Sequence, residues 1–162
     1  MASLPIWKNT PTGSMDVFRA AIPLHDSDTI LASDKWSISK WSVEEGHVEN
    51  VPLEGNSEHI AGIQSVSISP NGQLVATAAN RAVMIWHADS GTILCGPLEG
   101  HTDDIYALSF SADSKMLISG SDDQTVRIWS AEHESSICGP LEGHTATVRS
   151  VCFRYILTRS EL

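Results

Sequence analysis

The sequence has few basic residues and none of the long apolar runs that membrane proteins need. It holds 10 Lys and Arg against 20 Asp and Glu, for a net charge of −10. Nucleic-acid binding needs clustered Lys and Arg to neutralise phosphates, so this composition argues against that function. No apolar stretch approaches the roughly 20 residues of a membrane span, and the first residues of the sequence lack the charged and apolar pattern of a secretory signal. We therefore expect an intracellular protein, cytoplasmic or nuclear, with no nucleic-acid or membrane partner.

Cysteines are few, and motifs for metal binding or catalysis are missing. Cys95, Cys138 and Cys152 give an odd count without a C-x-x-C pair, which favours small buried side chains over a metal or disulfide role. The sequence contains no H-E-x-x-H, no G-x-S-x-G and no glycine-rich phosphate loop. We therefore expect no metal, no cofactor and no enzymatic activity.

One eight-residue stretch occurs twice. Cys-Gly-Pro-Leu-Glu-Gly-His-Thr spans 95–102 and returns at 138–145, 43 residues later. A repeat at such a period indicates an array of similar supersecondary units. The Cys-to-Thr stretch marks the joint between successive units.

Short segments with alternating apolar residues lie between turns rich in Gly, Pro, Asn, Asp and Ser, and no helical period is present. This pattern predicts an all-β chain. The expected strands are 16–22, 29–33, 36–41, 47–53, 63–68, 73–78, 82–86, 92–95, 104–110, 115–119, 125–129 and 136–138.

The pattern resembles the WD-repeat family of β-propellers, whose units begin with Gly-His and end with Trp-Asp. Gly100-His101 and Gly143-His144 supply the first element, and Trp41, Trp86 and Trp129 supply the second. None of these Trp residues is followed by Asp, a departure that does not undo the fold. The resemblance implies four-stranded antiparallel blades.

Three such blades plus one extra strand are expected, which makes an incomplete propeller. The expected units are a remnant of a preceding repeat over 1–15, a degenerate WD blade over 16–58, WD blades over 59–100 and 101–143, and the start of a further, truncated repeat over 144–162. The loss of pattern after Phe153 suggests a truncated fragment. Self-association that completes the propeller is an alternative.

Ser, His and Asp close in space would also fit a nucleophilic triad. The resemblance instead implies that His101, Ser119, Asp123 and Trp129 form a structural hydrogen-bond network. The equivalent positions in the preceding unit are His59, Thr77, Asn80 and Trp86, where Asn80 weakens the network. Because a catalytic triad would not recur in graded form along an array, we interpret these residues as structural.

The resemblance implies a non-catalytic protein–protein interaction scaffold that binds protein or peptide partners through surface loops. Two alternatives stay open: a ligand-sensing WD segment of a fungal NACHT-type signalling protein, and a truncated gene product without independent function. The first rests on the Cys-to-Thr joint, which looks like that of fungal WD arrays. The candidate partner-binding loop residues are Asn80, Arg81, Thr102, Asp103, Asp122 and Gln124.

Overall fold

The described part of the chain consists of strands and turns. A computed structural model describes the backbone strands at 20–23, 29–33, 38–42 and 48–51, and the backbone and side chains of 62–133 and 136–153. These ranges contain no helix, and so none long and apolar enough to cross a membrane. The predicted all-β class is confirmed.

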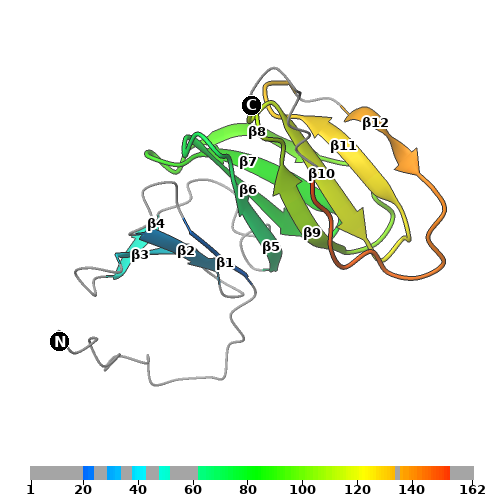
Figure 1. Cartoon of the computed structure of the whole chain (residues 1–162), viewed down its shortest axis with the longest axis horizontal. Coiled ribbons are helices and arrows are strands. Elements are labelled where there is room, and N and C mark those ends of the chain that lie inside the picture. The colour runs from blue at the N-terminus through cyan, green and yellow to red at the C-terminus, as the bar shows by residue number, and fades with distance from the viewer. Residues whose placement is uncertain are drawn as a thin grey trace, which may run out of the picture.

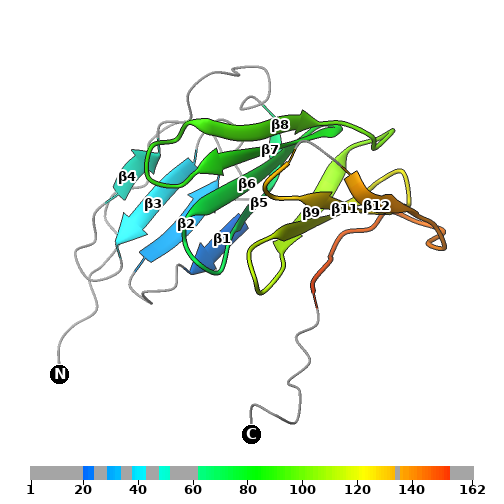
Figure 2. The same ribbon diagram turned by 90° about the horizontal axis from the view of Figure 1, so that it is seen from above.

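Within the described ranges, twelve strands form three four-stranded antiparallel sheets (Figures 1 and 2). The first sheet contains β1 (Ala20–Pro23), β2 (Thr29–Ser33), β3 (Ile38–Ser42) and β4 (Val48–Val51). The second contains β5 (Ile63–Ile68), β6 (Leu74–Ala79), β7 (Ala82–His87) and β8 (Ile93–Leu98). The third contains β9 (Ile105–Phe110), β10 (Met116–Ser121), β11 (Val126–Ser130) and β12 (Ser136–Leu141).

The sheets follow one another in chain order. The ribbon passes from the blue first sheet through the green second sheet to the yellow and orange third sheet (Figure 1). β9 contacts β5 and β6, and β5 in turn contacts β1 and β2. The first strand of each of the last two sheets therefore lies against the preceding sheet.

Residues 142–153 follow β12 but pair with no strand among the described residues. The extra strand expected here is thus present only as an irregular segment, because a strand needs a hydrogen-bonded neighbour on at least one side. The segment still contacts the third sheet, since the Val148 N–H donates to the Ser121 carbonyl at 2.9 Å. The expected remnant over 1–15 and residues 154–162 lie outside the described residues.

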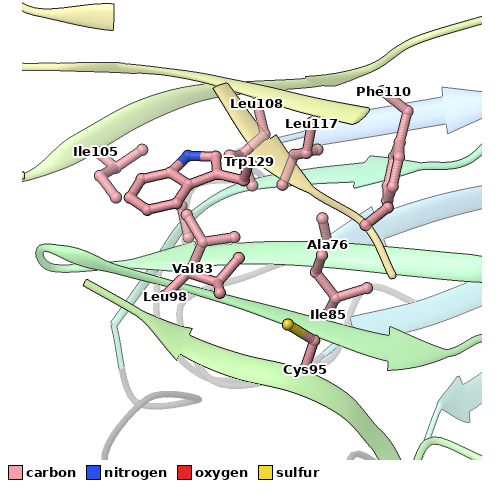
Figure 3. Close-up of a cluster of buried hydrophobic side chains, with 12 residues drawn as sticks. Ala76, Val83, Ile85, Cys95, Leu98, Ile105, Leu108, Phe110, Leu117 and Trp129 are labelled. Carbon is pink, nitrogen blue, oxygen red and sulfur yellow. The ribbon is translucent and has the colours of Figure 1, made fainter. Parts of the chain in front are cut away.

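The main core fills the space between the second and third sheets. Trp129 and Leu117 of the third sheet, 1% and 0% exposed, belong to one buried cluster with Val83 and Ile85 of the second. Figure 3 shows the Trp129 indole beside Ile105 and above Val83. Apolar burial stabilises by about 25 cal/mol per Å², so this interface is the main source of contact energy between the two sheets.

Gly96 occupies a place in the repeated joint that a larger residue cannot fill. Its φ is +119°, and a Cβ built there would lie 2.7 Å from the Val83 carbonyl oxygen and 3.2 Å from the Met84 Cα. We expect Gly96→Ala to lower the free energy of unfolding by about 2 kcal/mol or more, because backbone strain and a clash with backbone atoms combine.

Gly72→Ala is the matched control. Gly72 also has a positive φ, +73°, but a Cβ there would meet nothing within 4 Å. Its replacement should lower the free energy of unfolding by only about 1 kcal/mol, because alanine is unfavourable at a positive φ. Urea denaturation followed by circular dichroism measures both, and equal losses would show that the close approach at Gly96 contributes nothing.

Candidate functional site

Four side chains predicted to form one network come together in the third sheet. His101 precedes β9, Ser119 lies in β10, Asp123 lies in the turn after β10, and Trp129 lies in β11. His101 Nδ1 lies 2.8 Å from Asp123 Oδ2, and His101 Nε2 lies 2.7 Å from Ser119 Oγ. Trp129 Nε1 donates to the same Ser119 Oγ at 2.8 Å. The network therefore ties the joint before β9 to both central strands.

The two end groups of the network, the Asp123 carboxylate and the Trp129 indole N–H, determine which atoms of His101 and Ser119 carry a proton. Burial lowers the pKa of His101 below its ordinary 6.5 and outweighs the opposing effects of the hydrogen bond and charge of Asp123. The ring is thus neutral at pH 7, with its proton on Nδ1, because the Asp123 carboxylate only accepts. Nε2 then accepts from the Ser119 hydroxyl, whose oxygen accepts the indole N–H. The Ser119 hydroxyl thus both donates and accepts, and His101 Nδ1 also lies 3.3 Å from the Thr125 hydroxyl oxygen.

Asp123 is the hub of the turn between β10 and β11. Its Oδ2 accepts from the Thr102 N–H at 2.9 Å, and its Oδ1 accepts from the Thr125 N–H at 2.9 Å and the Thr125 hydroxyl at 2.7 Å. Burial opposes ionisation, but the bonds from Thr125, Thr102 and His101 outweigh it and lower the pKa of Asp123 to about 2. The carboxylate is therefore ionised in the folded protein at neutral pH.

The second sheet holds a comparable contact. Trp86 Nε1 donates to the Thr77 hydroxyl at 2.8 Å, and both residues are 0% exposed. Asn80 lies in the turn between β6 and β7, which corresponds to the turn between β10 and β11 that holds Asp123. The φ of Asn80 is +51°, and its carbonyl accepts from the Ile105 N–H at 2.8 Å. His59 lies outside the described residues.

The predicted partner-binding residues gather at one end of the second and third sheets. Asp122 is half-buried, and the other five are exposed: Asn80, Arg81, Thr102, Asp103 and Gln124. The turns lie close together, because the Asp122 N–H donates to the Asp104 carbonyl at 2.8 Å and Gln64 Nε2 donates to Asp104 Oδ2 at 2.9 Å. These bonds connect the turn after β10, the segment before β9 and β5.

Several residues of this region were not predicted from the sequence. Thr125 binds Asp123 twice, a contact that the Asp-Gln-Thr spacing of an Asx-type turn can signal. Ser121 donates to the Asp103 carbonyl and accepts from the Asp123 N–H. Arg127 lies with its Cζ 6.0 Å from the Trp129 ring centre, and its buried Nε has no hydrogen-bond partner within the described residues. No sequence signal identifies Arg127.

A groove of about 630 Å³ lies at the opposite end of the two sheets. The turn before β6 contributes Asn71, the end of β7 contributes His87, the turn after β7 contributes Asp89, and the turn before β10 contributes Lys115. None of the predicted site residues lines it. The groove is open and mixed in charge, and the His101 network does not reach it.

The hydrogen-bonded order Ser119–His101–Asp123 matches the arrangement of a nucleophilic triad, but the hydroxyl is enclosed. Ser119 is 0% exposed, and its oxygen already accepts the Trp129 N–H. A nucleophile must reach the atom that it attacks. In the folded protein this hydroxyl is buried in β10 and is bonded to Trp129 of β11 and to His101.

Comparisons with known proteins find WD repeats in the same part of the chain as the second and third sheets. Residues 51–87 and 92–130 match the family model "WD domain, G-beta repeat". The human intraflagellar transport protein 122 homolog is 33% identical over 61 residues, which cover 38% of this chain and 5% of that protein. Chicken WD repeat-containing protein 1 is 37% identical over 70 residues, which cover 41% of this chain and 12% of that protein.

Solved structures extend the similarity across most of the chain. The structure of U3-55K superposes with a TM-score of 0.72 at 28% identity, and the RRP9 WD40 repeats with 0.69 at 30%. In each case the match covers 86% of this chain and 43% of the other. The chain thus spans less than half of these structures, and 5 and 12% of the two curated relatives named above. The three sheets match the blades of WD40 propellers and form an open array, and residues 51–87 and 92–130 are repeats of the WD family.

Proposed function

We propose that this chain is a non-catalytic protein–protein interaction scaffold that binds intracellular proteins or peptides. The observation that carries the proposal is the enclosure of Ser119, the hydroxyl of the triad-like arrangement, inside a satisfied hydrogen-bond network beneath an exposed polar surface. WD40 repeats mediate protein–protein interactions, and the similarity to WD-repeat proteins supports the same role here.

The network of His101, Ser119, Asp123 and Trp129 is assigned a structural role in this proposal. Its hydrogen bonds connect the joint before β9 to the turn after β10. These two segments carry the exposed Thr102, Asp103 and Gln124. A buried network stiffens its surroundings, because each polar group is costly when unpaired. The network therefore holds the partner-binding loops in one arrangement, and rigid loops lose less entropy on binding.

The proposed binding surface is the loop end formed by Asn80, Arg81, Thr102, Asp103, Asp122 and Gln124. It mixes one cation with two carboxylates and three neutral polar side chains. Charged rims of this kind select partners by charge complementarity and raise association rates. A peptide with both charged and neutral polar residues matches this surface.

A displayed library of random peptides, selected on the full chain, tests the proposal. For the peptides that bind, we expect Arg81→Glu and Asp103→Lys each to raise the dissociation constant at least about tenfold, which corresponds to a loss of 1.4 kcal/mol in binding free energy. Fluorescence anisotropy with labelled peptides gives the constants. Ser119→Ala should retain binding within a few-fold if the variant stays folded.

Lys115→Glu and Asp89→Lys are matched charge reversals at the opposite end of the sheets, in the groove. They should leave the same peptides bound with unchanged affinity. Peptides that respond only to these two variants would place the binding surface in the groove and contradict the proposed one. Turnover of a hydrolase substrate that disappears in a folded Ser119→Ala variant would contradict the non-catalytic role.

A further inference from the structure

Arg127 of β11 lies in a narrow space between the two copies of the repeated joint. A Cβ built at Gly100, in the first copy, would lie 2.9 Å from Arg127 Nη1. A Cβ built at Gly139, in the second copy, would lie 3.0 Å from Arg127 Cγ. The lack of a side chain at both glycines therefore leaves the room that the Arg127 side chain occupies.

Trp129 forms another wall of this space. Arg127 and Trp129 are two residues apart in β11, so their side chains point to the same face of the third sheet. That face meets the second sheet, because Trp129 packs in one buried cluster with Val83 and Ile85. The Arg127 Cζ lies 6.0 Å from the centre of the Trp129 ring, which is within the range of a cation–π contact. Packing thus holds the half-buried Arg127 between two described sheets.

The guanidinium of Arg127 has no carboxylate partner among the described residues. Its Nε is buried without a hydrogen-bond partner, and the one ion pair in that part of the chain joins His101 to Asp123. Buried polar groups are nearly always bonded, so such a donor needs an explanation. Scarcity of carboxylates is not the reason, since the sequence holds 20 acidic residues. The guanidinium is therefore available to an acceptor from another molecule.

Arg127 lies beside the proposed binding surface. Its Nη1 is next to Gly100, and two residues further along the chain is Thr102, which belongs to that surface. Burial lowers the pKa of His101 most, and the nearby charge of Arg127 also lowers it. The guanidinium is thus within electrostatic reach of the network whose Asp123 accepts from the Thr102 N–H.

We propose that Arg127 binds a carboxylate from an Asp or Glu side chain of the peptide that occupies the loop end. This inference rests on the proposed function, because it names the chemistry of the partner at the same surface. A planar guanidinium pairs with a carboxylate through two parallel N–H donors, whereas an ammonium group acts as a point charge. The carboxylate accepts from the two Nη groups, because Nε is buried.

A double-mutant cycle between chain and peptide tests the pairing. Peptides selected on the full chain are synthesised with amidated C-termini, and each Asp or Glu is replaced in turn by Asn or Gln. We expect one such replacement to raise the dissociation constant for the unchanged chain at least about tenfold in fluorescence anisotropy. Arg127→Lys should raise it as much for the intact peptide. With both changes present, the peptide replacement should add less than about twofold.

Arg149→Lys is the matched control in the chain. Arg149 also lies over an aromatic ring, with its Cζ 4.8 Å from the centre of the Tyr106 ring, but it is exposed and is not one of the residues of the proposed surface. This variant should bind the intact peptide with unchanged affinity. The peptide replacement should cost it as much as it costs the unchanged chain. Far-ultraviolet circular dichroism checks that both lysine variants are folded.

A second measurement uses the unchanged chain. Burial and the charge of Arg127 both lower the pKa of His101, so a carboxylate that pairs with Arg127 should raise this pKa. A pH titration of the His101 ring by nuclear magnetic resonance should show the rise with the intact peptide. The peptide whose carboxylate is replaced by an amide should not produce it at the same fraction bound.

The results that overturn this inference differ from those that overturn the proposed function. Peptides that respond to Arg81→Glu and Asp103→Lys but bind the Arg127→Lys chain with unchanged affinity would overturn the inference alone. Additive losses in the cycle, equal losses for Arg127→Lys and Arg149→Lys, or an unchanged pKa of His101 would do the same. A selection that yields no peptide sensitive to Arg81→Glu and Asp103→Lys would contradict the proposed function, and this inference with it.

Discussion

Replacing Trp129 with alanine should lower the free energy of unfolding by about 3–5 kcal/mol, the range for removing a buried aromatic side chain. The indole is 1% exposed and lies in the cluster between the second and third sheets. The change leaves a cavity there and also leaves Ser119 Oγ without the N–H that it accepts. Because whole domains are stable by only about 5–15 kcal/mol, this loss is a large share of the total. Urea denaturation followed by far-ultraviolet circular dichroism measures it.

Trp129→Phe separates packing from hydrogen bonding. Phenylalanine keeps most of the apolar contact with Val83 and Ile105 but cannot donate to Ser119, so we expect a smaller loss of about 1–2 kcal/mol. A double-mutant cycle with Ser119→Ala should be non-additive, because both changes remove the same bond. Equal losses for the alanine and phenylalanine variants would show that the cavity is not the main cost. Additive losses in the cycle would contradict the bond.

Asp123→Asn should lower the free energy of unfolding by about 2–3 kcal/mol, because hydrogen bonds to charged groups are worth about 1.5–3 kcal/mol. The carboxylate accepts from Thr102, from Thr125 and from His101. An amide at this position has one acceptor oxygen and places an NH₂ group against one of these donors. Asp122→Asn is the matched control with the same change in charge. It should cost less than about 1 kcal/mol, because Asp122 accepts one side-chain hydrogen bond, from the Thr147 hydroxyl, and an amide oxygen can still accept it.

The pH dependence of stability gives a second measurement of the same contact. The folded-state pKa of Asp123, about 2, lies below its ordinary 3.8, so its contribution is present above pH 3.8 and is lost as the pH falls toward 2. Burial lowers the pKa of His101 below 6.5, so stability also falls as the pH drops below that value. In both ranges the unfolded chain binds more protons, and stability rises with pH. Asp123→Asn should reduce the rise of stability with pH between about 2 and 3.8. An unchanged dependence of stability on pH would contradict the shifted pKa of Asp123.

The strands could be predicted from the sequence because their signals are local. The alternation in 63–68 and the turn residues around Gly72 place β5 and the start of β6 within one residue. β12 is longer than predicted, Ser136–Leu141, because the repeated joint itself continues the strand. Alternation does not reveal that extension, since Gly139 and Pro140 are weak strand formers.

The candidate site could be predicted only in part. Repetition and family resemblance together placed His101, Ser119, Asp123 and Trp129 in one network. The prediction of buried cysteines holds for Cys95 and is wrong for Cys138 and Cys152, which are exposed. Cys95 and Cys138 have the same local sequence, so the local sequence could not distinguish their burial. The position of Arg127 beside Gly100 likewise depends on the twist of β11 against the joint, which no single segment encodes.

The strand order has a consequence for the rate of folding. Every ladder joins strands that are adjacent in sequence, so each sheet closes through short turns. The entropy of loop closure grows with loop length, and proteins with local contacts fold faster than those with distant ones. Each blade of this chain can therefore form as a separate meander before any blade meets its neighbour. Docking of one finished meander on the next is then the slow, cooperative step, and Trp129 and Leu117 contribute mainly to that step.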